Sequence, residues 1–212
     1  MQKKDISEAV IKRLPKYYRY LTDMENAGIQ KISSKELSEK MNLNASQIRQ
    51  DFNCFGGFGQ QGYGYNVKSL RMQMANILGL IKPYNAVLVG AGNIGQAIIN
   101  YTGFKKDGFN IAAAFDKNGK IIGTNVNGVP VYDISQIDDY IKQNKVDIAI
   151  IATPKERAQQ IADIVTGAGV KSIWNFATVD LKLDEDVVVE NVHLSDSLNV
   201  LLYKTSNDYK PL

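Results

Sequence analysis

Residues 86–99 read AVLVGAGNIGQAII, and this stretch decides the fold of the second half of the chain. The apolar run at 86–89 is typical of a strand that is buried on both faces. It leads into a glycine turn and then a helical stretch, whose free N–H groups form a site for phosphate. In this spacing the first glycine allows a tight turn, the second lets the backbone approach a pyrophosphate, and the third allows close helix packing. The sequence therefore predicts a dinucleotide-binding turn made of Gly90, Ala91, Gly92, Asn93, Ile94 and Gly95.

The rest of this half repeats the pattern of strand and helix. Apolar runs at 111–115, 148–152 and 172–174 are separated by helical stretches, notably at 134–144 and 155–168. Strands that alternate with helices pair in parallel through right-handed crossovers. We therefore predict an α/β Rossmann domain, a doubly wound parallel sheet, over residues 83–192.

Asp116 ends the second apolar run, 21 residues after Gly95, where the dinucleotide fingerprint expects an acid. A carboxylate there accepts a hydrogen bond from a ribose 2′-hydroxyl and repels a 2′-phosphate, which favours NADH and NAD+ over their phosphorylated forms. The neighbouring Lys117 slightly weakens this preference. Lys117 is also assigned to the cofactor site, as are Thr153 and Pro154, which follow the run at 148–152.

The first 82 residues carry the basic charge of the chain. They hold 13 Lys and Arg against 7 Asp and Glu, whereas the whole chain has a net charge of only +3. A polyanion is a plausible partner for this part. Asp5 with Glu8 predicts a helix that ends near Leu14, because proline cannot donate a backbone bond inside a helix, and Pro15 then begins a second helix that ends at Gly28.

Two short helices follow. Ser33 with Glu36 forms a capping box for the first, and Asn44 with Gln47 caps the second after a turn at residues 41–44. In the second helix Ile48 and Phe52 face inward. Its outer face is polar and rich in amides, as expected for a helix-turn-helix that reads DNA. That outer face comprises Ser46, Arg49, Gln50 and Asn53.

Residues 55–65 are rich in glycine and aromatic residues, which predicts a hairpin in the position of a wing. Asn66 then caps a helix that ends at Pro83. Residues 1–82 are therefore predicted to form a winged helix-turn-helix domain.

The tail, residues 193–212, contains a predicted helix at 195–204 with an apolar stripe and no later element to cover it. Such stripes usually seek a partner surface. A second subunit is the simplest partner, because a helix-turn-helix generally reads a palindrome as a symmetric dimer. Packing of the helix against its own domain remains the alternative.

An enzyme would need a substrate domain and an acid or base beside the nicotinamide. The sequence shows neither, so we expect no enzyme and no catalytic residue. His193 is the only histidine, with a structural role favoured over that of a general base. One cysteine and one histidine also argue against a metal site with several such ligands. A small NAD-dependent oxidoreductase and a nucleotide-binding interaction module remain alternatives.

No apolar run is long enough to cross a bilayer, and the start of the chain has no signal-type segment. The expected location is the cytoplasm.

Seven segments, in this order, resemble the Rex family of redox-sensing transcriptional repressors, and the resemblance covers essentially the whole chain. They are residues 9–21 (AVIKRLPKYYRYL), 32–37 (ISSKEL), 47–51 (QIRQD), 59–65 (GQQGYGY), 90–95 (GAGNIG), 174–177 (WNFA) and 190–194 (ENVHL).

This resemblance implies a homodimer whose C-terminal helix is swapped across to the partner, between that subunit's two domains. It also implies that binding of NADH closes the dimer and releases palindromic, A·T-rich operator DNA. Tyr101, Asn175 and Phe176 would lie near the nicotinamide, together with His193 and Leu194 from the tail of the other subunit.

On DNA we expect the second helix to enter the major groove through Ser46, Gln47, Arg49 and Gln50, since glutamine and arginine can bind adenine and guanine with two hydrogen bonds. The expected phosphate contacts are Arg13, Lys16, Tyr17 and Ser34. The wing would reach the minor groove through Gln61 and Tyr63.

The chain departs from some members of the family at three places. Gln50 stands where some have lysine, and Gln60 and Gln61 stand where some have a basic pair, which leaves the operator sequence open. His193 replaces an aspartate that in those relatives pairs with the tyrosine matching Tyr101, which leaves the details of the redox switch open.

Overall fold

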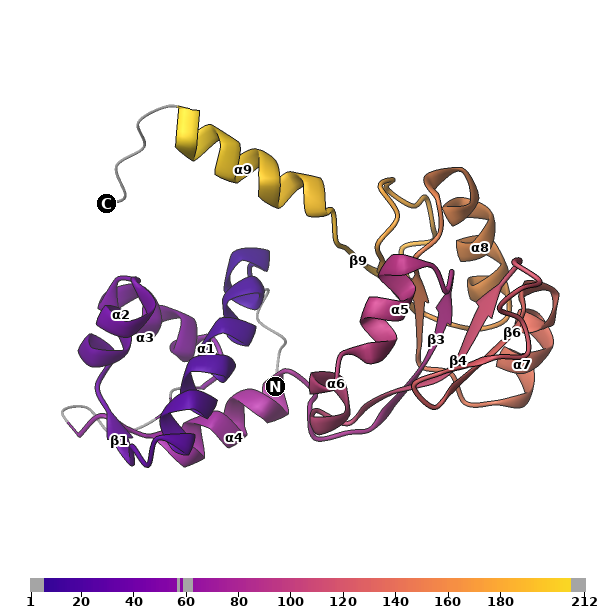
Figure 1. The fold of residues 1–212 in the computed structure, drawn as a ribbon. Coiled ribbons are helices and arrows are strands. Elements are labelled where there is room, and N and C mark those ends of the chain that lie inside the picture. The colour runs from indigo at the N-terminus through magenta and orange to yellow at the C-terminus, as the bar shows by residue number, and fades with distance from the viewer. Residues whose placement is uncertain (1–5, 57, 59–62, 207–212) are drawn as a thin grey trace. The chain divides into compact units, whose positions relative to one another are not determined.

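The computed structural model describes residues 6–56, 58 and 63–206, and the chain divides into two compact units, Met1–Lys82 and Pro83–Leu212 (Figure 1). The division falls at Pro83, where the sequence pattern changes from helices to alternating strands and helices.

The first unit is built around helix α1 (Glu8–Asn26), which packs against α4 (Val67–Ile77). The prediction of two helices divided at Pro15 was wrong, because α1 runs continuously through this proline. A proline inside a helix costs about 3 kcal/mol. The buried stripe of α1 lies on both sides of Pro15, and its packing outweighs that loss. The stripe comprises Val10, Leu14, Tyr17, Leu21 and Met24.

The start of α1 also differs from the expectation. The proposed cap, Asp5, lies outside the described residues, and Ser7 occupies the N-cap position without a side-chain bond. At the other end Gly28 has a φ of 76°, which is the left-handed conformation that ends the helix as predicted.

The predicted helix-turn-helix is confirmed as α2 (Ser34–Met41) and α3 (Ala45–Asn53). The Ser33 hydroxyl accepts the Glu36 N–H at 3.1 Å, and the Glu36 carboxylate accepts the Ser33 N–H at 2.7 Å, which completes the capping box. Asn44 caps α3 by accepting the Ser46 N–H at 2.8 Å, but Gln47 does not complete the cap as predicted, because its amide donates to Asp51.

A short antiparallel pair, β1 (Lys31–Ile32) and β2 (Tyr65–Asn66), forms the base of the region where the wing is predicted. Residues 57 and 59–62, including Gln60 and Gln61, lie outside the described residues. Phe52 of α3 joins this region to the core through edge-on contacts with Phe58 and Tyr65, whose ring centroids lie 5.4 and 5.3 Å away.

Helix α4 begins at the predicted cap, since the Asn66 side chain accepts the Ser69 N–H at 2.8 Å. It ends at Ile77, however, and not at Pro83 as predicted. Gly79 has a φ of 78°, and the Leu80 N–H donates to the Ala75 carbonyl at 2.8 Å. This left-handed turn ends the helix before the proline is reached.

The second unit contains a seven-stranded sheet in the order β5-β6-β4-β3-β7-β8-β9. The edge strand β5 (Asn125–Val126) pairs antiparallel with β6, and the other pairings are parallel. The parallel strands are β3 (Tyr84–Val89), β4 (Phe109–Asp116), β6 (Val129–Asp133), β7 (Ile148–Ile151), β8 (Ser172–Asn175) and β9 (Val188–Asn191). This strand order confirms the doubly wound Rossmann fold.

Helices cover both faces of this sheet (Figure 1). Val87 and Val89 of β3 face a core shared with α7 (Ile137–Gln143) and α8 (Lys155–Gly167). Ala86 and Leu88 face a core shared with α5 (Asn93–Asn100), against which the short helix α6 (Gly103–Lys106) also packs. A 3-10 helix, η1 (Ile134–Gln136), precedes α7, and α9 (Leu194–Ser206) follows β9.

Candidate functional site

The glycine turn connects β3 to α5, and its three glycines differ in the space that a side chain would have. Gly90 has a φ of 98°, and a Cβ there would lie 2.5 Å from the Ala152 carbonyl oxygen. A Cβ on Gly95 would lie 2.1 Å from the Gly90 carbonyl oxygen. A Cβ on Gly92 would meet no atom within 4 Å. The turn therefore needs Gly90 and Gly95 for its own packing and leaves open space beside Gly92.

Helix α5 begins immediately after this open space. Gly92 is its N-cap residue, and no side chain caps the helix. The first N–H groups of a helix lack partners inside the helix and attract an anion. The open space and these donors together suit a pyrophosphate.

Asp116 lies at the end of β4, where its carboxylate is held by two backbone N–H groups. Oδ2 accepts the Ala91 N–H at 2.7 Å, and Oδ1 accepts the Asn118 N–H at 2.9 Å. The carboxylate is thus tied directly to the glycine turn. Each oxygen has a second lone pair to offer a ribose hydroxyl.

A cavity of about 450 Å³ lies beside Asp116. Six of the predicted cofactor residues line it: Gly90, Gly92, Asp116, Lys117, Thr153 and Pro154. Apolar side chains make up most of the remaining wall, as is usual for a small-molecule site. The Thr153 hydroxyl is buried and has no hydrogen-bond partner among residues 6–56, 58 and 63–206. A buried hydroxyl without a hydrogen-bond partner costs free energy, and a bound ligand that supplied a partner would remove this cost.

Part of the cavity wall was missed in the sequence. Helix α8 contributes Arg157, Gln160, Ile161 and Ile164, and η1 contributes Ile134 and Ser135. The helix that follows Pro154 places three of these residues on one face, because Arg157, Gln160 and Ile164 recur at helical spacing. This spacing is visible in the sequence and could have located them.

The residues expected near the nicotinamide lie outside the lining of this cavity. Asn175 is fully buried, and its amide donates to the Val179 carbonyl and to the Asn191 side chain, both at 2.8 Å. Phe176 packs on Trp174 with ring centroids 4.7 Å apart. Tyr101 is 60% exposed.

His193 precedes the C-terminal helix. Its Nδ1 lies 3.6 Å from Asp196 Oδ2, and within the described part of the chain its buried Nε2 has no hydrogen-bond partner. The next residue, Leu194, is exposed.

None of the described residues of α9 is buried. Its large apolar side chains are more than half exposed, namely Leu194, Leu198, Val200, Leu201, Leu202 and Tyr203. This exposure contradicts the alternative that the helix packs against its own domain.

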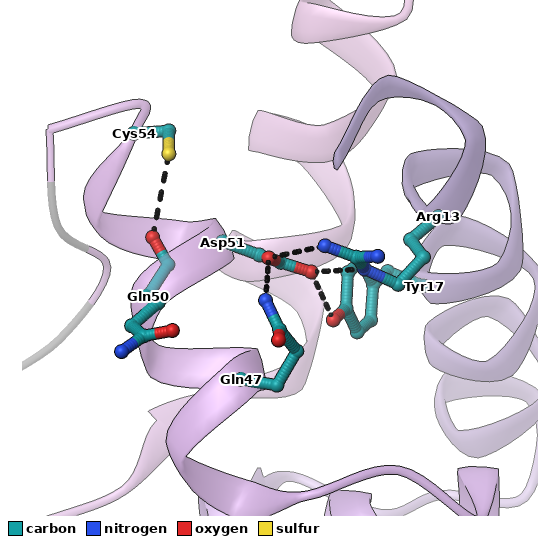
Figure 2. A network of polar contacts seen from close by, with 6 residues as sticks. All are labelled: Arg13, Tyr17, Gln47, Gln50, Asp51 and Cys54. Carbon is teal, nitrogen blue, oxygen red and sulfur yellow. Dashed lines mark hydrogen bonds and ion pairs between the residues drawn. The ribbon is translucent and has the colours of Figure 1, made fainter. Parts of the chain in front are cut away.

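In the first unit a buried carboxylate joins the two helices that carry the predicted DNA contacts (Figure 2). Asp51 of α3 accepts hydrogen bonds from Arg13, Tyr17 and Gln47, at 2.6 to 2.8 Å. Burial alone would raise the pKa of Asp51, but these hydrogen bonds and the charge of Arg13 outweigh it and lower the pKa. Burial, followed by the hydrogen bond to Asp51, raises the pKa of Tyr17.

The hydrogen bonds to Asp51 show that one predicted DNA contact, Tyr17, was wrong. They also engage the side chains of two others, Arg13 and Gln47. Tyr17 is fully buried and its hydroxyl donates to Asp51, so it cannot reach a phosphate. Arg13 is partly exposed but already donates twice to Asp51. The Gln47 amide also donates to Asp51 and is turned inward from the outer face of α3 (Figure 2).

The remaining predicted contacts that the structure describes are exposed or partly exposed. Ser46, Arg49 and Gln50 are exposed on α3, and Arg49 donates to the Ser34 hydroxyl at 3.1 Å. Lys16 is partly buried and donates to the Met41 carbonyl at 2.9 Å. Tyr63 is 75% exposed, whereas Gln61 lies outside the described residues.

In the described part of the chain, no helix is both long and apolar enough to span a membrane. Those same residues include no group of three or more His, Cys, Asp or Glu side chains that could hold a metal ion.

Two family models match the chain. Residues 81–179 match a model described as "CoA binding domain", and residues 5–53 match one described as "Putative DNA-binding protein N-terminus". The two matches fall on the two units of the structure.

Relatives match over nearly the whole chain. A protein from Clostridium botulinum (strain Hall) named redox-sensing transcriptional repressor Rex is 57% identical over 200 residues, which cover 94% of this chain and 95% of that protein. A crystal structure of RSP in complex with beta-NAD+ and operator DNA matches with a TM-score of 0.92 and 52% identity, covering 97% of this chain and 95% of the other. RSP in complex with beta-NADH matches with a TM-score of 0.90 and 50% identity, covering 97% of both chains.

Proposed function

Because the chain belongs to the Rex family of redox-sensing transcriptional repressors, we propose that it is a DNA-binding repressor that senses the ratio of NADH to NAD+. It binds palindromic operator DNA when NADH is scarce and releases the DNA on binding NADH. The observation that carries this proposal is that one chain joins a dinucleotide turn beside a cavity of about 450 Å³ to a helix-turn-helix with an exposed polar face.

The second unit holds the cofactor. The pyrophosphate lies in the open space beside Gly92 and binds the first N–H groups of α5. The Asp116 carboxylate accepts a hydrogen bond from the ribose 2′-hydroxyl. The apolar walls of the cavity enclose the adenine, and the Thr153 hydroxyl gains a partner there. Tyr101, Asn175 and Phe176 lie beside the nicotinamide, together with His193 and Leu194 of the partner subunit.

The bound cofactor supplies the redox signal, because its nicotinamide ring is positively charged only in the oxidised form. Burial of an unpaired charge is costly, and neither Tyr101 nor Phe176 carries a carboxylate that could pair with the oxidised ring. A dry pocket at this end of the cofactor therefore favours the reduced, neutral ring. His193, which stands where some relatives carry aspartate, likewise places no permanent negative charge near the ring.

The protein acts as a homodimer in the cytoplasm and is not an enzyme. Its exposed apolar helix α9 supplies the dimer contact by crossing to the partner subunit. Two subunits then present two copies of α3 to the two halves of a palindrome.

The first unit reads DNA through exposed side chains of α3. Ser46, Arg49 and Gln50 contact base edges in the major groove. Lys16, Ser34 and the outward side of Arg13 contact phosphates. Tyr63, with Gln61, reaches the minor groove.

The experiment that tests this function follows a labelled, A·T-rich palindromic duplex by fluorescence anisotropy as protein is added, with NADH, with NAD+ or with neither. We expect tight binding with NAD+ or without cofactor, and weaker binding with NADH. Equal binding of the duplex in all three titrations would contradict the proposal.

A further inference from the structure

The short helix α6 holds the ring of Tyr101 in place. A Cβ on Gly103 would lie 2.4 Å from Cε1 of this ring, 2.7 Å from Cζ and 2.8 Å from the hydroxyl oxygen. The ring also packs edge-on against Phe104, with ring centroids 4.6 Å apart. Since Tyr101 is 60% exposed, these contacts with α6 largely decide where its ring lies.

Phe104 also packs against an aromatic residue of strand β8. Its ring centroid lies 5.6 Å from that of Trp174 in β8, and Trp174 in turn packs on Phe176 at 4.7 Å. Phe109 braces the row by touching both Phe104 and Trp174. A continuous row of aromatic rings thus joins Tyr101, which follows α5, to Phe176, which follows β8.

We propose that Gly103 and Phe104 are positioning residues for the nicotinamide end of the cofactor. Gly103 leaves the space that the Tyr101 ring occupies, and Phe104 fixes that ring and, through Trp174, the ring of Phe176. The positions of the two outer rings, Tyr101 and Phe176, are thereby fixed relative to each other. The inference rests on the proposed function, which puts Tyr101 and Phe176 beside the nicotinamide.

The row of rings is separate from the adenosine end of the site. None of its members, nor Gly103, lines the cavity beside Asp116. A change in α6 should therefore alter binding of the nicotinamide end alone. ADP-ribose, which lacks the nicotinamide, serves as the probe for the other end.

The test is Gly103→Ala. The φ of Gly103 is not positive, so alanine fits this backbone, and the atoms that its methyl group would meet belong to the movable ring of Tyr101. Gly167→Ala is the matched control, because Gly167 also lies in a helix and a Cβ there would meet no atom within 4 Å. Affinities for NADH and for ADP-ribose are measured by calorimetry on the full chain.

We expect Gly103→Ala to weaken NADH binding by about three- to tenfold, the range of an aromatic contact, and to leave ADP-ribose binding unchanged. Phe104→Leu should show the same selective loss, and Gly167→Ala should change neither affinity. Unchanged NADH affinity in Gly103→Ala, or equal losses for both ligands, would overturn the inference. Wild-type protein that bound neither ligand would instead overturn the proposed function, and the inference with it.

Discussion

The guanidinium of Arg13 in α1 donates to both oxygens of the Asp51 carboxylate in α3, at 2.6 Å from Nε and 2.8 Å from Nη2. The Asp51 side chain is fully buried, and that of Arg13 is 25% exposed. This pair fixes the helix that carries the predicted base contacts to the longest helix of the first unit.

Asp51→Ala should destabilise the first unit by about 3 kcal/mol, because it leaves Arg13 and the buried Tyr17 hydroxyl without their partner. Urea unfolding followed by far-UV circular dichroism measures the loss. The single tryptophan, Trp174, lies in the second unit, so its fluorescence serves as an internal control and should report unchanged unfolding of that unit. A loss below about 0.5 kcal/mol, the range of ordinary surface substitutions, would contradict the role of the network.

Comparison of wild type with Asp51→Ala also shows how the stability contributed by Asp51 depends on pH. The pKa of Asp51 is lowered in the folded protein, so its contribution to stability is fully present above its unfolded pKa of about 3.9. That contribution is lost as the pH falls through the lower, folded pKa. The difference in free energy of unfolding between wild type and Asp51→Ala should therefore be constant near neutral pH and shrink in strong acid. A difference that grew on acidification would have the wrong sign.

The three glycines of the turn should separate folding from binding. Gly92→Ala should fold with nearly wild-type stability, because its methyl group meets no protein atom, yet lose at least about tenfold in NADH affinity as that methyl blocks the pyrophosphate. Gly95→Ala should instead lower the free energy of unfolding by about 1–3 kcal/mol, since its methyl overlaps the Gly90 carbonyl. Thermal unfolding and calorimetry distinguish the two. Full NADH affinity in a folded Gly92→Ala would argue against this turn as the pyrophosphate site.

Most of the fold could be predicted because its signals are local. The capping residues Ser33, Asn44 and Asn66 lie within three residues of the N–H groups that they cap. Gly90 and Gly95 are needed by the backbone of the turn itself. Periodicity then placed β3, β4, β7 and β8 and the helices α7 and α8, whereas β6 and β9 were not predicted.

Most of the wrong or missing predictions depend on distant parts of the chain; the early end of α4 is the exception, because the local turn at Gly79 sets it. The continuity of α1 through Pro15 depends on packing against α4, which no local rule contains. Tyr17 looks like a surface tyrosine in sequence, but its partner Asp51 is 34 residues away. The two-residue strand β1 forms only because it pairs with Tyr65–Asn66. The spacing of the α8 residues was visible in the sequence, but that this face of α8 lines the same cavity as Asp116 appears only in the folded structure.

Arg49 is expected to carry base recognition. Arg49→Ala should cost about 1–3 kcal/mol of discrimination between operator and mismatched duplex. Lys120→Ala, which removes the same charge from an exposed position in the second unit, is the control and should leave discrimination unchanged. Binding to both duplexes is compared at one salt concentration. Equal discrimination in Arg49→Ala and wild type would remove Arg49 from the set of base contacts.

The apolar stripe of α9 is expected to hold the dimer together. Leu201 and Leu202 are 59% and 54% exposed in the single chain, so a charge placed there would be tolerated by the monomer but not by an apolar interface. Leu201→Glu should shift the protein from dimer to monomer in sedimentation, while Lys120→Glu, at an exposed position outside α9, should not. A dimer that survives Leu201→Glu at micromolar concentration would contradict this role for α9.

The central claim is that the cofactor site and the DNA-reading helix of this chain are energetically coupled. Coupling between two sites is reciprocal, so the most direct test is calorimetric titration of NADH into the free protein and into protein saturated with operator duplex. We predict that the duplex weakens NADH binding by the same factor by which NADH weakens duplex binding, within the typical range of about 5- to 150-fold. Identical NADH affinity with and without the duplex would contradict the account.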